Sequence, residues 1–73
     1  MEHLNQELAL IMEVDEVNAG DVLRDFPEWD SLTVLSVISM IHVNYGVSLS
    51  ANDIRGIDTP QALYELIGTK RAN

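Results

Sequence analysis

The stretch Glu28–Gly46, EWDSLTVLSVISMIHVNYG, decides the fold. Many of its apolar residues are β-branched, and by propensity alone this composition favours a strand. Residues 31–45, however, run on without a turn signal for longer than a typical strand. Asp30 or Ser31 can cap a helix at its N-terminus, and Gly46 stands where a left-handed C-terminal residue is expected. The stretch therefore predicts one long helix over residues 31–45.

The two sides of this predicted helix differ in character. At about 100° per residue, one side is a broad apolar arc that predicts core packing: Val34, Leu35, Val37, Ile38, Ile41 and Tyr45. The opposite side has small hydroxyls and apolar side chains but no charge: Leu32, Ser36, Ser39, Met40 and Val43. A partner can desolvate such a surface cheaply. We expect a docking surface here, because so short a chain has few elements to cover it; a helix buried on nearly every side is the alternative.

Three further helices are predicted around the long one. Residues 2–14 are amphipathic, Ser50-Ala51-Asn52-Asp53 resembles a capping box that opens a short helix through about Gly56, and Thr59-Pro60 begins a last helix that Gly68 ends. Residues 15–29 have no sustained period, but they are too apolar for disorder and should pack across the helices. The prediction is an all-α fold, a small four-helix bundle with three longer helices, one short helix and a long loop between the first two, forming a single domain over residues 1–73.

Composition excludes several classes of function. The 73 residues include no cysteine, so disulfides and thiolate metal sites are excluded. Twelve acids against four bases give a formal net charge of −8, which disfavours binding to nucleic acid or anionic membranes and favours basic protein surfaces. No apolar run is long enough for membrane insertion, and no signal peptide is recognisable. We therefore expect a cytoplasmic protein.

Ser31 is the candidate site for chemistry. In the first turn of a helix its hydroxyl lies beside unpaired backbone N–H groups and the positive end of the helix dipole, a favourable place for a phosphodiester. The residues thus indicate an attachment point for a phosphate-linked prosthetic group, unless Asp30 and Ser31 are simply N-cap residues. A catalytic role needs a nearby base. His42 is about 16 Å along the same helix, nothing ties His3 to Ser31, and the two histidines make no metal site. We do not expect an enzyme.

Taken together, these features resemble the acyl carrier protein family over nearly the whole chain. The resemblance includes the acidic loop, the triplet Asp30-Ser31-Leu32, the helix ending at Tyr45-Gly46, the Val47-Ser48-Leu49 turn and the Ile57-Asp58-Thr59-Pro60 segment. It implies that a phosphopantetheinyl transferase, using its own Mg²⁺, attaches the 4′-phosphopantetheine arm of coenzyme A to Ser31. The thiol of that arm would carry acyl groups as thioesters. Asp30 would cap the helix and help to present the serine, and Leu32 would anchor in a pocket of the partner.

The resemblance also implies an acyl pocket and a docking surface. The pocket maps to apolar residues that ordinary core packing explains equally well: Ile38, Ile41, Ile54, Ile57 and Leu63. This sequence departs from the usual acidic long helix, because no acid occurs between Asp30 and Asp53. Docking is therefore expected on Leu32, Ser36, Met40 and Val43, with Glu28, Asp30 and Asp53 at the rim. The expected partners of this monomer are acyl-transferring or condensing enzymes with basic or apolar docking surfaces.

The cargo and some alternatives stay open. The missing acids on the long helix weaken the case for a housekeeping fatty-acid carrier. They make a dedicated carrier for a specialised lipid, a polyketide-like product or an aminoacyl group credible. An aminoacyl or peptidyl carrier domain is one alternative, although such domains commonly have histidine in place of Asp30. An unmodified helical interaction module, in which Ser31 is only a cap, is another. A phosphoserine switch at Ser31 is a third, and the acids before the serine oppose it. The Met1 start and the short tail favour a standalone protein. Trp29 replaces a residue that is often small in the family, and we have no physical account of it.

Overall fold

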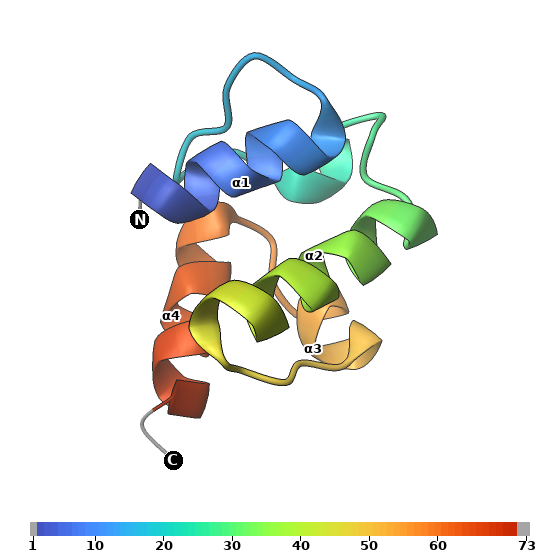
Figure 1. The fold of residues 1–73 in the computed structure, drawn as a ribbon. Coiled ribbons are helices and arrows are strands. Elements are labelled where there is room, and N and C mark those ends of the chain that lie inside the picture. The colour runs from blue at the N-terminus through green and yellow to red at the C-terminus, as the bar shows by residue number, and fades with distance from the viewer. Residues whose placement is uncertain (1, 72–73) are drawn as a thin grey trace.

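The computed structural model describes residues 2–71; Met1, Ala72 and Asn73, which complete the expected 1–73 domain, lie outside the described residues. Over that range the elements are α1 (Glu2–Met12), a 3₁₀ turn η1 (Leu23–Asp25), α2 (Ser31–Tyr45), α3 (Ala51–Arg55) and α4 (Pro60–Arg71). In Figure 1, α2 crosses the molecule between α1 and the short α3, and the loop after α1 arches over α1. The predicted all-α fold, with three longer helices, one short helix and a long first loop, is confirmed.

The core takes apolar side chains from all four helices and from the loop. The side chains with no more than 2% exposure are Leu4, Leu8, Met12, Leu23, Val37, Ile41, Ile54, Pro60, Leu63 and Ile67. Within the predicted arc of α2, Val37 and Ile41 are fully buried, and Val34, Ile38 and Tyr45 pack against the core while partly exposed. Most of the arc is therefore core, as predicted.

Two residues of α2 differ from the prediction, one on each flank of the arc. Met40, expected on the exposed docking side, is only 9% exposed and belongs to the core cluster. Leu35, expected in the core, is 59% exposed. On the helical wheel Met40 lies about 60° from the fully buried Val37, and both belong to the same core cluster, so the core extends to this flank. The five-residue α3 leaves the flank with Leu35 open.

The ends of the helices follow from local hydrogen bonds. Gly46 adopts the predicted left-handed conformation with φ 67°, and its N–H donates to the carbonyl of His42. Thr59 caps α4, because the Ala62 N–H donates to its Oγ1 at 3.1 Å. The prediction that Gly68 ends the last helix is wrong, since α4 continues to Arg71. A glycine inside a helix costs only about 1 kcal/mol, and Lys70 and Arg71 occupy the last turn, where the helix dipole favours cations.

The capping box at α3 is present in both directions. The Asp53 N–H donates to Ser50 Oγ at 3.2 Å, and the Ser50 N–H donates to Asp53 Oδ2 at 3.0 Å. The bond from the Ser50 N–H is the main cause that lowers the pKa of Asp53 below the usual aspartate value of 3.8. The carboxylate form therefore stabilises the folded state.

This lowered pKa predicts how Asp53→Asn changes stability with pH. A depressed folded-state pKa contributes stability that is present above the unfolded value and is lost as pH falls through the folded value. The wild type should therefore be more stable than Asp53→Asn at neutral pH, and the difference should shrink below pH 3.8. Urea unfolding of both proteins from neutral pH to below pH 3.8 measures this difference in stability. A difference that stays constant with pH would show that ionisation of Asp53 does not stabilise the fold.

The end of α1 is strained at Glu13. The Val14 N–H donates to the Ala9 carbonyl at 3.0 Å and the Glu13 N–H to the Leu10 carbonyl at 3.2 Å, which is the Schellman arrangement. It places Glu13 at φ 59°, a conformation that side chains other than glycine adopt at a cost of about 1–2 kcal/mol. This bend explains why α1 ends at Met12, two residues before the predicted end.

Glu13→Gly should consequently raise the free energy of unfolding by about 1 kcal/mol, because glycine adopts positive φ freely. Glu13→Ala is the matched control, since it removes the same charge and retains a Cβ at the strained position. Thermal unfolding of the two variants separates the two effects. Equal stability of both variants would attribute any gain to the lost charge rather than to the backbone.

The loop between α1 and α2 is held by the distant segment that joins α3 to α4 and by the first turn of α4. The Leu23 N–H donates to the Asp58 carbonyl at 2.8 Å, and the Gln61 N–H donates to the Ala19 carbonyl at 3.1 Å. Arg24 forms an ion pair with Asp58. Leu23 itself is 1% exposed. The predicted packing of the loop across the helices is confirmed, although η1 within it was not predicted.

Candidate functional site

Ser31 is the first residue of α2, and Asp30 rather than Ser31 is its N-cap. The Thr33 N–H donates to Asp30 Oδ1 at 2.9 Å, and the Thr33 hydroxyl donates to the Glu28 carbonyl at 2.7 Å. These bonds fix the turn that precedes the helix. Ser31 is exposed. Its hydroxyl is therefore available at the N-terminus of the helix without being needed to cap it.

Among the residues that the structure describes, no proton-accepting side chain forms a hydrogen bond with the Ser31 hydroxyl. Donation by the Thr33 backbone N–H lowers the pKa of Asp30, so its carboxylate is a weak base. His42 has its Nδ1 3.4 Å from Ser48 Oγ, and His3 has its Nε2 3.8 Å from a carboxylate oxygen of Glu7. Both histidines thus have partners elsewhere. Within residues 2–71 no group of three potential metal ligands comes together.

A groove of about 400 Å³, here called the Ser31 groove, lies between the start of α2 and α3. Its lining residues are Trp29, Asp30, Ser31, Val34, Leu35, Ala51 and Arg55. The walls are mainly apolar, and Asp30 and Arg55 supply one charge of each sign. These residues fit a phosphodiester on Ser31 followed by a flexible organic arm, because the groove combines charged and polar side chains with mainly apolar walls. The sequence did not predict that Arg55 belongs to this site. The only indication in the sequence is that Arg55 is the one lysine or arginine between Arg24 and Lys70.

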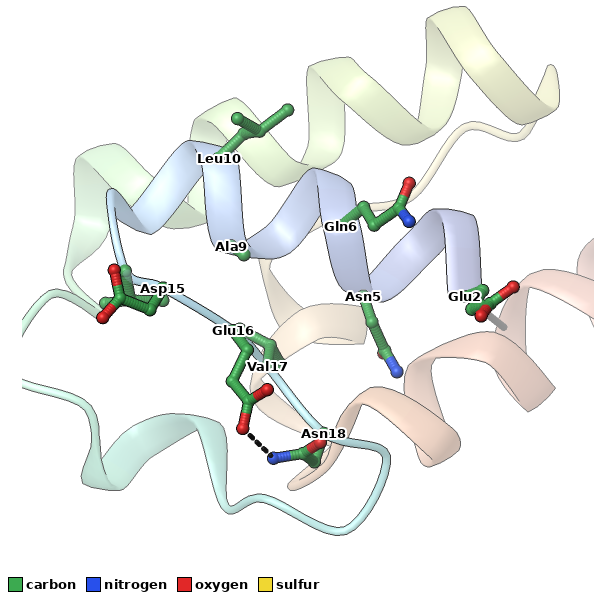
Figure 2. A pocket seen from close by; sticks show the side chains of 10 residues that line it. Glu2, Asn5, Gln6, Ala9, Leu10, Asp15, Glu16, Val17 and Asn18 are labelled. Atoms are coloured by element: carbon green, nitrogen blue, oxygen red, sulfur yellow. Dashed lines mark hydrogen bonds between the residues drawn. The ribbon is translucent and has the colours of Figure 1, made fainter.

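A wider groove of about 610 Å³, the α1 groove, lies between α1 and the segment after it (Figure 2). Its lining residues are Glu2, Asn5, Gln6, Ala9, Leu10, Val14, Asp15, Glu16, Val17 and Asn18. Figure 2 shows Asn5 and Ala9 on the side of α1 that faces the segment, where Asn18 donates to Glu16 at 3.5 Å. The α1 groove shares no residue with the Ser31 groove, and its side chains include no cation and no nucleophile.

The residues expected to form an acyl pocket all belong to the core or pack against it. Ile41, Ile54 and Leu63 have at most 1% exposure, and Ile38 and Ile57 are half-buried against the core. None of the five lines the Ser31 groove. A pocket among them therefore stays a prediction, and it would require the core to open around an acyl chain.

The expected docking residues differ in how much of each side chain is exposed. Leu32 is 75% exposed and Val43 is 76% exposed, and Ser36 and Glu28 are also exposed. Asp53 is half-buried and engaged in its capping box. The exception is Met40, whose burial removes it from this surface. Exposed Leu35 takes its place, so the uncharged surface comprises Leu32, Leu35, Ser36, Ser39 and Val43; we call it the α2 face.

The structure is similar to solved acyl carrier proteins. One is the solution structure of a holo acyl carrier protein from Geobacter metallireducens, with a TM-score of 0.76, 19% identity, and 96% of this chain and 83% of that one covered. Another is a candidate acyl carrier protein from Mycobacterium tuberculosis, with a TM-score of 0.79, 25% identity and 93% of each chain covered. No protein-family model and no curated protein matches the sequence.

The element order, the long loop and the position of Ser31 at the start of α2 were all expected from the resemblance to this family. The two solved structures match nearly the whole of the chain. Within residues 2–71, every helix is too short or too polar to cross a membrane. Over those residues the protein is therefore an all-helical, acyl-carrier-protein-like bundle.

Proposed function

We propose that this protein carries acyl groups as thioesters on a 4′-phosphopantetheine arm attached to Ser31. The observation that supports it best is the exposed Ser31 hydroxyl at the first position of α2, in a fold shared with a holo acyl carrier protein. Asp30 caps the helix, so the serine is left free to accept the group. The chain itself binds and presents the arm, and a transferase supplies the chemistry.

The modification forms a bond between Ser31 Oγ and phosphorus, and the thiol at the far end of the arm supplies the thioester chemistry that a cysteine-free chain lacks. The bond broken in exchange is the phosphoanhydride bond of coenzyme A, so adenosine 3′,5′-bisphosphate is the leaving group, and the hydroxyl proton leaves to a base of the transferase. This chain positions the group. The N–H groups and the dipole at the N-terminus of α2 favour the new negative charge, and the Ser31 groove offers apolar walls to the arm.

Intact mass spectrometry tests the proposal. The folded protein is incubated with coenzyme A, Mg²⁺ and a broad-specificity phosphopantetheinyl transferase. A gain of one phosphopantetheine, mapped to the peptide that contains Ser31, is the expected result. If the folded protein gains no mass while a known carrier in the same tube is modified, the chain is an unmodified interaction module instead. Loading with acyl or aminoacyl groups then distinguishes an acyl carrier from an aminoacyl or peptidyl carrier.

We further propose that enzymes of fatty-acid, polyketide-like or specialised lipid biosynthesis dock on the α2 face. No acid lies between Asp30 and Asp53, while Leu32 and Val43 are each about three-quarters exposed. Apolar contacts buried at the centre of an interface decide affinity, and charges at its rim, such as Glu28, mainly steer the encounter. The protein acts in the cytoplasm as a monomer on this proposal.

Leu32→Asp and Val43→Asp should each lower kcat/KM of the transferase about tenfold, because each puts a charge into an apolar contact that loses water on binding. Glu28→Gln, which alters only the rim, should mainly change the salt dependence of the rate. All three positions are exposed, so circular dichroism should show an unchanged helical content. Normal rates for both aspartate variants, with a large loss for Glu28→Gln, would mean that acids rather than apolar contacts dominate docking.

A further inference from the structure

Arg55 is a basic side chain beside Ser31 that the proposed function has not used. It is the last residue of α3 and lines the Ser31 groove together with Ser31 and Asp30. Among residues 2–71, the ion pairs are Arg24 with Asp58 and His3 with Glu7, so Arg55 has no ionic partner there. A cation is favoured at a helix C-terminus in general. An interaction with the dipole of α3 alone, however, would not require Arg55 to lie in the Ser31 groove.

The charges around Ser31 give Arg55 a more specific role. A phosphodiester on Ser31 adds a negative charge directly beside Asp30, which hydrogen bonding keeps ionised, in a chain whose net charge is already −8. Like charges this close repel each other. Of the seven residues that line the groove, Arg55 alone carries a positive charge. Its planar guanidinium also matches the geometry of phosphate oxygens better than an ammonium does.

The other lysine and arginine residues lie away from the Ser31 groove. Arg24 forms an ion pair with Asp58. Lys70 and Arg71 line a separate hollow with Tyr45 and Gly46, at the opposite end of α2 from Ser31. Arg55 is therefore the base that the fold brings into the same groove as the serine.

We propose that Arg55 binds the phosphodiester on Ser31 and so holds the first part of the arm in the Ser31 groove, against Val34 and Leu35. This inference rests on the proposed attachment of the arm to Ser31. A carboxylate at the end of an acyl cargo is a second possible anion for the same guanidinium. The phosphodiester is favoured because it forms on Ser31 Oγ itself, within the groove, whereas such a carboxylate is the full length of the arm away.

The test is a thermodynamic cycle between Arg55 and the phosphodiester. The free energy of unfolding is measured for the wild type and Arg55→Gln, each before and after loading by the transferase, with loading verified by intact mass. Loss of Arg55 should weaken the loaded protein more than the unloaded one, by about two- to fivefold in the unfolding equilibrium constant, as for a partly exposed ion pair. Salt should remove this extra loss. Arg71→Gln, an equal change of charge in a different hollow, should affect both forms alike.

A second measurement does not depend on stability. In ¹H–¹⁵N spectra at low salt, the Arg55 Nε–H resonance should shift when the arm is attached, while those of Arg24 and Arg71 stay in place. A role confined to the dipole of α3 would leave the Arg55 resonance unmoved and make Arg55→Gln equally costly in both forms, and that result would overturn the inference. A shift that appears only after loading a malonyl thioester, and not an acetyl thioester, would also overturn it by assigning Arg55 to the cargo. Failure to gain mass would instead refute the proposed function.

Discussion

Ser31→Ala should abolish modification by the transferase while leaving the unmodified protein as stable as the wild type. Loss of modification follows from the missing hydroxyl. Retained stability follows from the structure, because Asp30, and not Ser31, accepts the Thr33 N–H at 2.9 Å and caps α2. Alanine also has the highest intrinsic helix propensity of any residue. Intact mass and thermal unfolding of the same sample measure both expectations.

Ser36→Ala and Ser39→Ala are the matched controls for this variant. Both serines lie on the same helix and are exposed like Ser31, but neither is next to the N-terminus of α2. Both variants should be modified completely. Modification of Ser31→Ala itself would place the group on another residue and contradict the proposed site. A large loss of stability in Ser31→Ala would contradict the assignment of Asp30 as the cap.

Ile41→Ala should destabilise the protein by about 2–5 kcal/mol, the range found when a large aliphatic side chain is removed from a core. Ile41 is 0% exposed in the middle of the core cluster. A domain of this size rarely has more than about 3–5 kcal/mol of stability in total. The variant should therefore be substantially unfolded at 25 °C, with a clear loss of helical circular dichroism.

Leu32→Ala provides the comparison for the core variant. Leu32 is on the same helix but is 75% exposed, so its truncation should change stability by no more than about 0.5 kcal/mol. Urea unfolding of the two variants gives the contrast. If Ile41→Ala and Leu32→Ala were equally stable, the core of the protein would lie elsewhere than in the described structure.

Local signals in the sequence predicted most helix boundaries correctly. Asp30, Ser50 and Thr59 each accept a hydrogen bond from a backbone N–H three residues later, and such bonds depend only on nearby residues. Gly46 ends α2 through its own left-handed backbone conformation. Ser31 as the candidate site could be predicted for the same reason, since its position relative to the helix start is a local property. Gly68 misled the prediction because a glycine only weakens a helix and does not by itself end one.

The burial pattern of α2 and the Ser31 groove, which the sequence did not predict, depend on contacts between distant segments. Met40 is buried and Leu35 is exposed, and no periodicity within α2 indicates which flank of the apolar arc the rest of the molecule covers. The Ser31 groove was missed for a similar reason. Arg55 is 24 positions after Ser31 in the sequence, and only the packing of α3 against α2 brings both to one groove.

The attachment of the first loop to Asp58 and to the first turn of α4 also bears on how the chain folds. The hydrogen bonds from Leu23 to Asp58 and from Gln61 to Ala19 join residues 35 and 42 positions apart. Such contacts form only after the intervening chain has closed a large loop, and the entropy of that closure slows folding relative to a bundle held by local contacts alone. We therefore expect the helices to form before the part of the loop from Ala19 to Leu23 reaches its native place.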